Sequence, residues 1–237
     1  PAPWSGADVG SVGIAGTSLH NAGTFTLEGS GVDIWGTADG FRYVYQALSG
    51  DGEIVARVTG IENTNSGANA GVMIRESLSA GAPHASTVLT ASSGIGFVRR
   101  AGASASSSVS TATGAMPYWV RVVRSGNSFT SFRSSNGTTW TQVGSAVTIT
   151  MNTNVLIGIV VTAKNNTTLC TATFDSVQVI AGAPRASAGT ATLSSTTMAA
   201  ATMRSAMAAA KRSMPVFSTT RVSALKSLLD ENANIVP

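Results

Sequence analysis

The sequence predicts an all-β domain of two antiparallel sheets in residues 1–180, followed by a C-terminal arm. Three observations support this prediction. Apolar and polar residues alternate with a period of two in many short runs, as half-buried strands require. Clusters of Gly, Asn and Ser separate these runs and supply turn residues. No segment before residue 180 keeps a helical period, so the domain is expected to be a sandwich or barrel.

The alternation places individual strands along the chain. In one run Phe41, Tyr43 and Tyr45 share a face, and further strands are predicted near 25–27, 54–59, 118–124 and 128–133. The last two runs are predicted to form a hairpin with a three-residue loop, Ser125-Gly-Asn127. Residues 100–116 are low in complexity and predict an edge strand, with a mobile loop as the alternative.

The segment Ser134-Ser-Asn-Gly-Thr-Thr-Trp140 resembles a shortened Asp-box hairpin, a turn device of sialidase-type proteins. Asn136 stands where the box has Asp. We expect its side-chain oxygen to accept backbone hydrogen bonds in the turn. Trp140 is expected to close the turn and to pack beneath it as a buried residue.

Charge divides the chain near residue 180. Residues 1–180 carry nine basic and nine acidic side chains, so the net charge of +4 resides in the last 57 residues. Residues 181–195 have the composition of a linker, and residues 196–237 form a basic arm rich in Ala, Met, Ser and Thr. The arm has too few large apolar groups to fold alone, and we therefore expect something to hold it.

The residue pattern of the arm predicts one or two short amphipathic helices, separated by Pro215. They pack either on their own domain or on a partner, and narrow Met-rich faces suit both arrangements. The candidate partner-binding residues are Met203, Arg204, Met207, Lys211, Arg212, Arg221, Val222, Leu225 and Leu229.

Several segments of residues 4–180 together resemble the bacterial DUF1349-type module, a concanavalin A-like or laminin G-like jelly roll. The resemblance implies two antiparallel sheets of six or seven strands, a place within large exported proteins, and no established catalytic residues. The short stretch 65–69 departs from the family pattern by lacking bulk, which disfavours a ligand site there. The matching segments are 8–13, 31–39, 41–52, 54–58, 70–78, 118–127 and 173–177.

The sequence shows no catalytic motif. Asp51 and Glu53 are the one closely spaced acid pair, and flanking glycines predict a solvated turn rather than the carboxylate pair of a glycosidase. His20 and His84 match no metal or nucleophile pattern. Cys170 stands alone in a strand, where a small buried thiol is expected. We therefore predict that the protein is not an enzyme.

Ligand sites are predicted only weakly. Asp33, Asp39 and Asp175 are candidate Ca²⁺ ligands, although turn capping explains the first two better. No other cofactor is expected. Exposed aromatic rings bind sugars, and the candidates are Trp35, Tyr43, Tyr45 and Trp119, but alternation places most of them in the core.

Nucleic acid is an unlikely partner, because the domain is neutral and its basic residues are not interleaved with aromatics. The short basic run Arg99-Arg100 predicts a solvated strand end. No apolar run reaches the roughly 18 residues of a membrane span, so membrane contact is expected only through a partner.

These observations favour a non-enzymatic structural or accessory subunit that binds protein partners or neighbouring copies in a larger extracytoplasmic assembly. The low charge, the start at Pro1 and the family resemblance favour a bacterial periplasmic, cell-surface or secreted protein. Filaments, surface layers and the periplasmic face of a respiratory or photosynthetic membrane complex all fit. A carbohydrate-binding module is the alternative, and a glycoside hydrolase a distant one.

Overall fold

The computed structural model describes residues 1–92 and 94–182 and confirms an all-β fold of two antiparallel sheets. Sheet A has the strand order β1-β4-β14-β6-β7-β8-β9, and sheet B the order β12-β11-β10-β5-β15-β3-β2, with β13 paired to β11. The strands are β1 (Ser5–Val9), β2 (Thr17–Asn21), β3 (Thr24–Gly31), β4 (Phe41–Ser49), β5 (Gly52–Ile61), β6 (Asn69–Arg75), β7 (His84–Thr90), β8 (Gly94–Arg100), β9 (Ser108–Thr113), β10 (Tyr118–Ser125), β11 (Ser128–Ser134), β12 (Thr141–Gln142), β13 (Val147–Thr148), β14 (Asn154–Thr162) and β15 (Asn165–Ala181).

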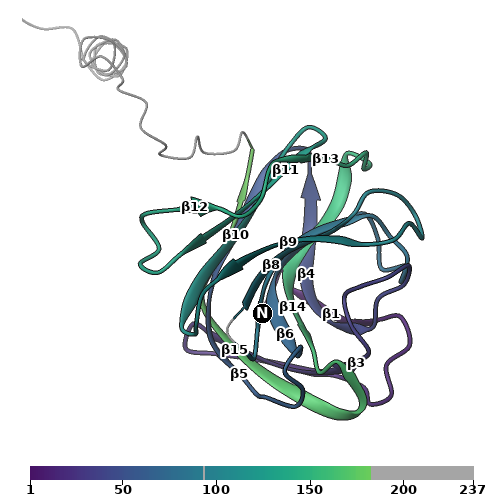
Figure 1. Cartoon of the computed structure of the whole chain (residues 1–237), viewed down its shortest axis with the longest axis vertical. Coiled ribbons are helices and arrows are strands. Elements are labelled where there is room, and N and C mark those ends of the chain that lie inside the picture. The colour runs from purple at the N-terminus through teal and green to yellow at the C-terminus, as the bar shows by residue number, and fades with distance from the viewer. Residues whose placement is uncertain (93, 183–237) are drawn as a thin grey trace, which may run out of the picture. The chain divides into compact units, whose positions relative to one another are not determined.

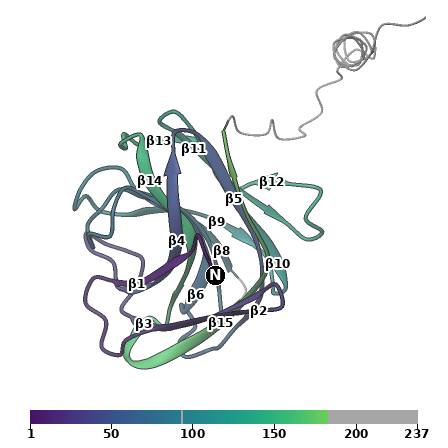
Figure 2. The same cartoon turned by 180° about the vertical axis from the view of Figure 1, so that it is seen from behind.

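The two sheets face each other across the main hydrophobic core (Figure 1 and, from behind, Figure 2). Sheet B contributes Phe25, Phe129 and Phe174, and sheet A contributes Phe97 and Ile157, all buried. Strands of sheet B such as β3 alternate in polarity, whereas β14 of sheet A, which carries Ile157, is apolar on both faces. Burial of this paired surface is the main force that holds the sandwich together.

A second hydrophobic cluster lies on the outer face of sheet A. Tyr43 belongs to it, whereas its neighbour Val44 belongs to the core between the sheets, because successive side chains point to opposite faces. Tyr43 donates its hydroxyl to the Met73 carbonyl at 3.2 Å. Tyr43 is therefore buried, as alternation predicts, but in this outer cluster and not between the two sheets. The rest of the cluster is Val9, Ile34, Phe41, Met73, Val88, Val98 and Val160.

The β10–β11 hairpin is confirmed, but its loop is shorter than predicted. Ser125 pairs with Ser128, which leaves Gly126 and Asn127 as a two-residue loop. Gly126 has a φ of +59°, the left-handed conformation that the first position of a type II′ turn requires. Because Gly126 adopts this conformation, two residues suffice to connect the strands, one fewer than predicted.

The turn after β11 uses Asn136 as predicted. Its Oδ1 accepts hydrogen bonds from the amides of Thr138 and Thr139 at 2.9 and 2.8 Å. The tryptophan that packs against the turn is Trp119, since a Cβ added at Gly137 would lie 2.7 Å from its Cε2. Trp140 is only half-buried and lies over the Arg121 guanidinium, 5.7 Å from ring centroid to Cζ, so its predicted place beneath the turn is wrong.

The edge strand predicted within residues 100–116 is confirmed, because β9 ends the strand order of sheet A. Cys170 is buried on β15 as expected. The predicted linker beyond residue 182 and the arm 196–237, with all the candidate partner-binding residues, lie outside the described residues. Within residues 1–92 and 94–182, no helix has the length and apolar character needed to cross a membrane.

Candidate functional site

The loop between β3 and β4, residues 32–40, folds over the outer face of sheet A, and we call it the cover loop. Asp33 and Gly40 form a β-bridge at its base. Gly31 has a φ of +120°, and a Cβ there would lie 2.0 Å from the Gly40 oxygen, so only glycine allows this closure. Thr162 donates its hydroxyl to the carbonyls of Gly31 and Gly40 at 3.1 and 3.0 Å. The base of the loop is therefore fixed to β14.

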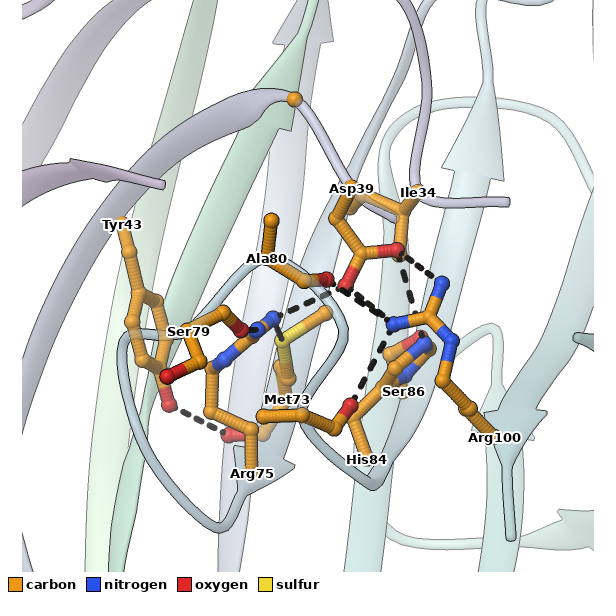
Figure 3. Close-up of polar contacts among 12 residues, drawn as sticks. Ile34, Asp39, Tyr43, Met73, Arg75, Ser79, Ala80, His84, Ser86 and Arg100 are labelled. Atoms are coloured by element: carbon orange, nitrogen blue, oxygen red, sulfur yellow. Dashed lines mark hydrogen bonds and ion pairs between the residues drawn. The ribbon is translucent and has the colours of Figure 1, made fainter. Parts of the chain in front are cut away.

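The C-terminal side of the cover loop is also held by a buried ion cluster (Figure 3). Asp39 lies between the guanidinium groups of Arg75 and Arg100, and none of these side chains is exposed. Arg100 meets Asp39 through two nitrogens, at 2.6 and 2.8 Å, and Arg75 reaches it at 3.2 Å. Arg75 also donates to the Ser77 carbonyl at 2.6 Å. Burial of charge is tolerated where a counter-charge and backbone carbonyls together satisfy the donors, as they do here.

His84 completes the cluster as its uncharged member. It is fully buried, its Nε2 lies 3.9 Å from Asp39 Oδ1, and neither ring nitrogen has a hydrogen-bond partner. Burial, together with the charges of Arg75 and Arg100, lowers its pKa well below the usual range. Burial also lowers the pKa of Arg75, although Asp39 opposes that shift. The single carboxylate therefore balances one of the two guanidiniums, and backbone carbonyls solvate the other.

A pocket of about 340 Å³ opens beside the cover loop, on the outer face of sheet A. Trp35 stands at its edge with 44% of its surface exposed. The floor includes Gly94 and Gly96 of β8, which leave room, and Thr111 of β9. The volume lies at the lower end of the range of about 300–1,000 Å³ for small-ligand sites. An exposed indole at the edge of a partly polar pocket suits a ligand that has a flat face.

Three polar side chains, with Gly67 between them, form the polar end of this pocket: Asp33, Asn69 and Lys164. Asp33 comes from the cover loop, and its Oδ1 accepts from its neighbour's amide at 2.8 Å. Lys164 comes from the turn between β14 and β15, and its Nζ lies 3.2 Å from Asp33 Oδ2. Asn69 begins β6 and donates to Asp33 Oδ1 at 3.4 Å. Three separate segments thus meet at one end of the pocket.

The structure gives each candidate Ca²⁺ ligand a cationic partner. Asp33 pairs with Lys164, Asp39 pairs with arginines, and Asp175 lies on sheet B beside Arg57 at 3.5 Å. The three carboxylates are therefore not brought together. Among the residues that the structure describes, no group of three or more His, Cys, Asp or Glu side chains could hold a metal ion.

Two predictions about charged residues are wrong. Glu53 was expected in a solvated turn but is 2% exposed and is ion-paired with Arg121. Arg100 was expected at a solvated strand end but is fully buried against Asp39. In both cases the partner lies more than 60 residues away, at Arg121 for Glu53 and at Asp39 for Arg100, so no local pattern reveals it.

The sequence patterns do not predict Arg75, His84, Asn69 and Lys164 as site residues. A local signal existed for Arg75, which ends an apolar strand on the same face as Met73. Stretch 65–69 was considered unfavourable for a ligand site because it lacks bulk. In the structure the small Gly67 and the short Asn69 line the polar end of the pocket, beside Lys164. Of the four aromatic candidates, only Trp35 lies at the pocket.

No protein-family model matches the chain, and no curated protein sequence matches it. Solved structures do. A functionally unknown protein from Saccharomyces cerevisiae matches 71% of this chain and 93% of its own, at 19% identity and a TM-score of 0.57. A mutant of the GH43 protein BlXynB from Bacillus licheniformis matches 70% and 38%, at 14% identity and a TM-score of 0.52. The Xyloglucan PUL GH43B of Bacteroides ovatus matches 68% and 33%, at 12% identity and a TM-score of 0.50.

At these identities the likeness shows the fold alone. Together with the two-sheet topology, the neighbours fit a concanavalin A-like jelly roll. The chain spans only about a third of each GH43 protein, 38% and 33%. The similarity therefore concerns one domain of those larger chains.

Proposed function

We propose that this β-sandwich binds carbohydrate in the pocket beside the cover loop. One observation carries the proposal: the exposed indole of Trp35 stands at the edge of a pocket whose other end is lined by Asp33, Asn69 and Lys164. Sugars present an apolar ring face and a rim of hydroxyls, so an aromatic platform beside polar groups is complementary to them. This reverses the order of the two functions that the sequence favoured.

The rigid support under the pocket favours binding as its role. The cover loop is fixed at its base by Thr162 and by Asp39, and at its tip by Arg100, which donates to the Gly36 carbonyl at 3.1 Å. Trp35 and Asp33 thus sit on a loop whose ends cannot shift independently of sheet A. A ligand then meets a preformed surface, which lowers the entropic cost of binding.

The acid content of the pocket favours binding over hydrolysis. Asp33 is the single carboxylate among the described residues that line it. Glycoside hydrolysis by the common mechanisms uses two carboxyl groups, about 5–5.5 Å apart in retaining enzymes and about 6.5–9.5 Å apart in inverting ones. We therefore propose a non-enzymatic module.

The structural neighbours supply weaker support. Two of them are GH43 proteins, and one carries the name of a polysaccharide, xyloglucan. We also propose membership of the DUF1349-type family, on the resemblance of the sequence segments alone, and an extracytoplasmic location, where polysaccharides are met. A role as an assembly subunit stays a prediction from the sequence, because the arm that suggested it lies outside the described residues.

A glycan array with the full chain tests the proposal, followed by titration calorimetry with the glycans it captures. We expect Trp35→Ala to weaken binding about tenfold, since contact with an aromatic ring contributes up to about 1.5 kcal/mol beyond the area that it buries. Trp140→Ala, which removes a half-buried indole from the turn between β11 and β12, is the matched control and should bind like the parent protein. Absence of any glycan binding, or equal losses in both variants, would contradict the proposal.

A further inference from the structure

The polar end of the pocket contains an acceptor without a partner. Asn69 is 6% exposed and lines the pocket. Its Nδ2 donates to the Gly67 carbonyl at 3.1 Å and to Asp33 Oδ1 at 3.4 Å. Both partners accept hydrogen bonds only, which fixes which atom of the amide is the nitrogen. Oδ1 is left without a partner, a costly state for a buried carbonyl oxygen.

Lys164 covers this end with a side chain that can move. Its stem lies against Gly67, where an added Cβ would be 2.6 Å from Lys164 Cδ. Its ammonium reaches Asp33, but 44% of the Lys164 side chain and 22% of the Asp33 side chain are exposed. Ion pairs this exposed contribute little to stability. A ligand that offers replacement hydrogen bonds can therefore displace the Lys164 stem and reach Asn69.

We propose that the polar end recognises two adjacent hydroxyl groups of a neutral sugar ring. One hydroxyl donates to Asn69 Oδ1. The neighbouring hydroxyl accepts from Lys164 Nζ and donates to Asp33, while the ring lies against Trp35. The proposal rests on the carbohydrate-binding function above and specifies the ligand within it.

The charges at this end favour a neutral ligand. The Asp33 carboxylate and the Lys164 ammonium balance each other at 3.2 Å. A uronic acid would place its own carboxylate beside Asp33, and like charges in a partly buried site repel. A neutral diol meets two acceptors and one donor, a set that fits the hydrogen-bonding capacity of paired hydroxyls.

Calorimetry with methyl glycosides of glucose, galactose, mannose and xylose, with their monodeoxy analogues, tests the inference on the full chain. Removing either hydroxyl of the recognised pair should weaken binding about tenfold, because a polar group of the site is then left unpaired. Removing a hydroxyl elsewhere should change affinity less than threefold. The methyl glycoside of glucuronic acid should bind no more tightly than that of glucose.

Two variants assign the hydroxyls. In Asn69→Leu, removal of one of the two hydroxyls from the sugar should no longer weaken binding, whereas it weakens binding to the parent protein about tenfold. In Lys164→Met, removal of the neighbouring hydroxyl should likewise have no effect on affinity. Val109→Ala changes an apolar side chain of the same pocket, so removal of either hydroxyl should still weaken binding about tenfold. If Asn69→Leu fails to unfold cooperatively, Lys164→Met still tests the inference, because Lys164 is partly exposed and its substitution should not disturb the fold.

Separate outcomes distinguish this inference from the proposed function. A sugar that binds, depends on Trp35, and keeps its full deoxy penalties in both variants would overturn the inference alone. Tighter binding of the glucuronide, lost in Lys164→Met, would also overturn it, since Lys164 would then read a carboxylate. A folded full chain that binds none of these glycosides or arrayed glycans would overturn both.

Discussion

The Arg100 guanidinium holds both oxygens of Asp39, with Nη2 2.6 Å from Oδ1 and Nη1 2.8 Å from Oδ2, across a separation of 61 residues. This bidentate pair joins the end of β8 to the cover loop within a fully buried cluster. It closes the second hydrophobic cluster on the outer face of sheet A and fixes the loop that carries Trp35.

Asp39→Asn should destabilise the protein by about 3–5 kcal/mol, because it leaves Arg75 and Arg100 buried without a counter-charge. Urea denaturation measures the free energy of unfolding. Asp175→Asn is the control, since its ion pair with Arg57 is exposed and should contribute about 0–1 kcal/mol. Similar losses in the two variants would mean that the buried charges are not balanced by Asp39.

Stability should decline as the pH falls from about 6.5 towards 5. His84 stays neutral in the folded state, where its pKa is lowered, and protonates in the unfolded chain near pH 6.5. The unfolded state therefore binds more protons, and the free energy of unfolding decreases by up to about 1.4 kcal/mol per pH unit. The decrease should continue until the folded-state pKa is reached.

Urea denaturation at several pH values checks this dependence. His84→Gln should flatten the slope between pH 6.5 and 5, whatever its effect on absolute stability. His20→Gln, which removes the exposed histidine of β2, should keep the slope of the parent protein. An unchanged slope in His84→Gln would exclude His84 as its source.

Asn136→Ala should lower stability by about 1 kcal/mol, because two backbone amides of the turn lose their shared acceptor. Calorimetry should then show a decrease in Tm of about 2–4 °C for a domain of this size. Asn136→Asp keeps an oxygen at the same place and should stay close to the parent. A larger loss in Asn136→Asp than in Asn136→Ala would contradict the role assigned to Oδ1.

Cys170 should be unreactive in the folded protein. Burial raises the pKa of its thiol to about 11, so little thiolate exists at pH 8. A thiol-reactive chromogenic disulfide should label it only after addition of urea. Ser106→Cys places a thiol at an exposed position and should react at once in the same buffer. Fast labelling of Cys170 in the native state would indicate that β15 opens locally.

Local patterns predicted much of the fold. The strands around 41–46, 54–59, 118–124 and 128–133 follow from period-two alternation, and the Asn136 turn follows from side-chain chemistry within a few residues. These features depend on neighbours in sequence, so the sequence by itself determined them. It also determined that Phe41 and Tyr43 share a face.

Only the tertiary structure decided what covers each face and which charges meet. Alternation cannot say whether the face with Tyr43 meets the other sheet or the cover loop, since both bury it equally. The partners Asp39 and Arg100, like Asp33 and Lys164, lie on separate segments that only the packed sheet brings together. Their pairing depends on long-range contacts, and the pocket beside Trp35 depends on that pairing.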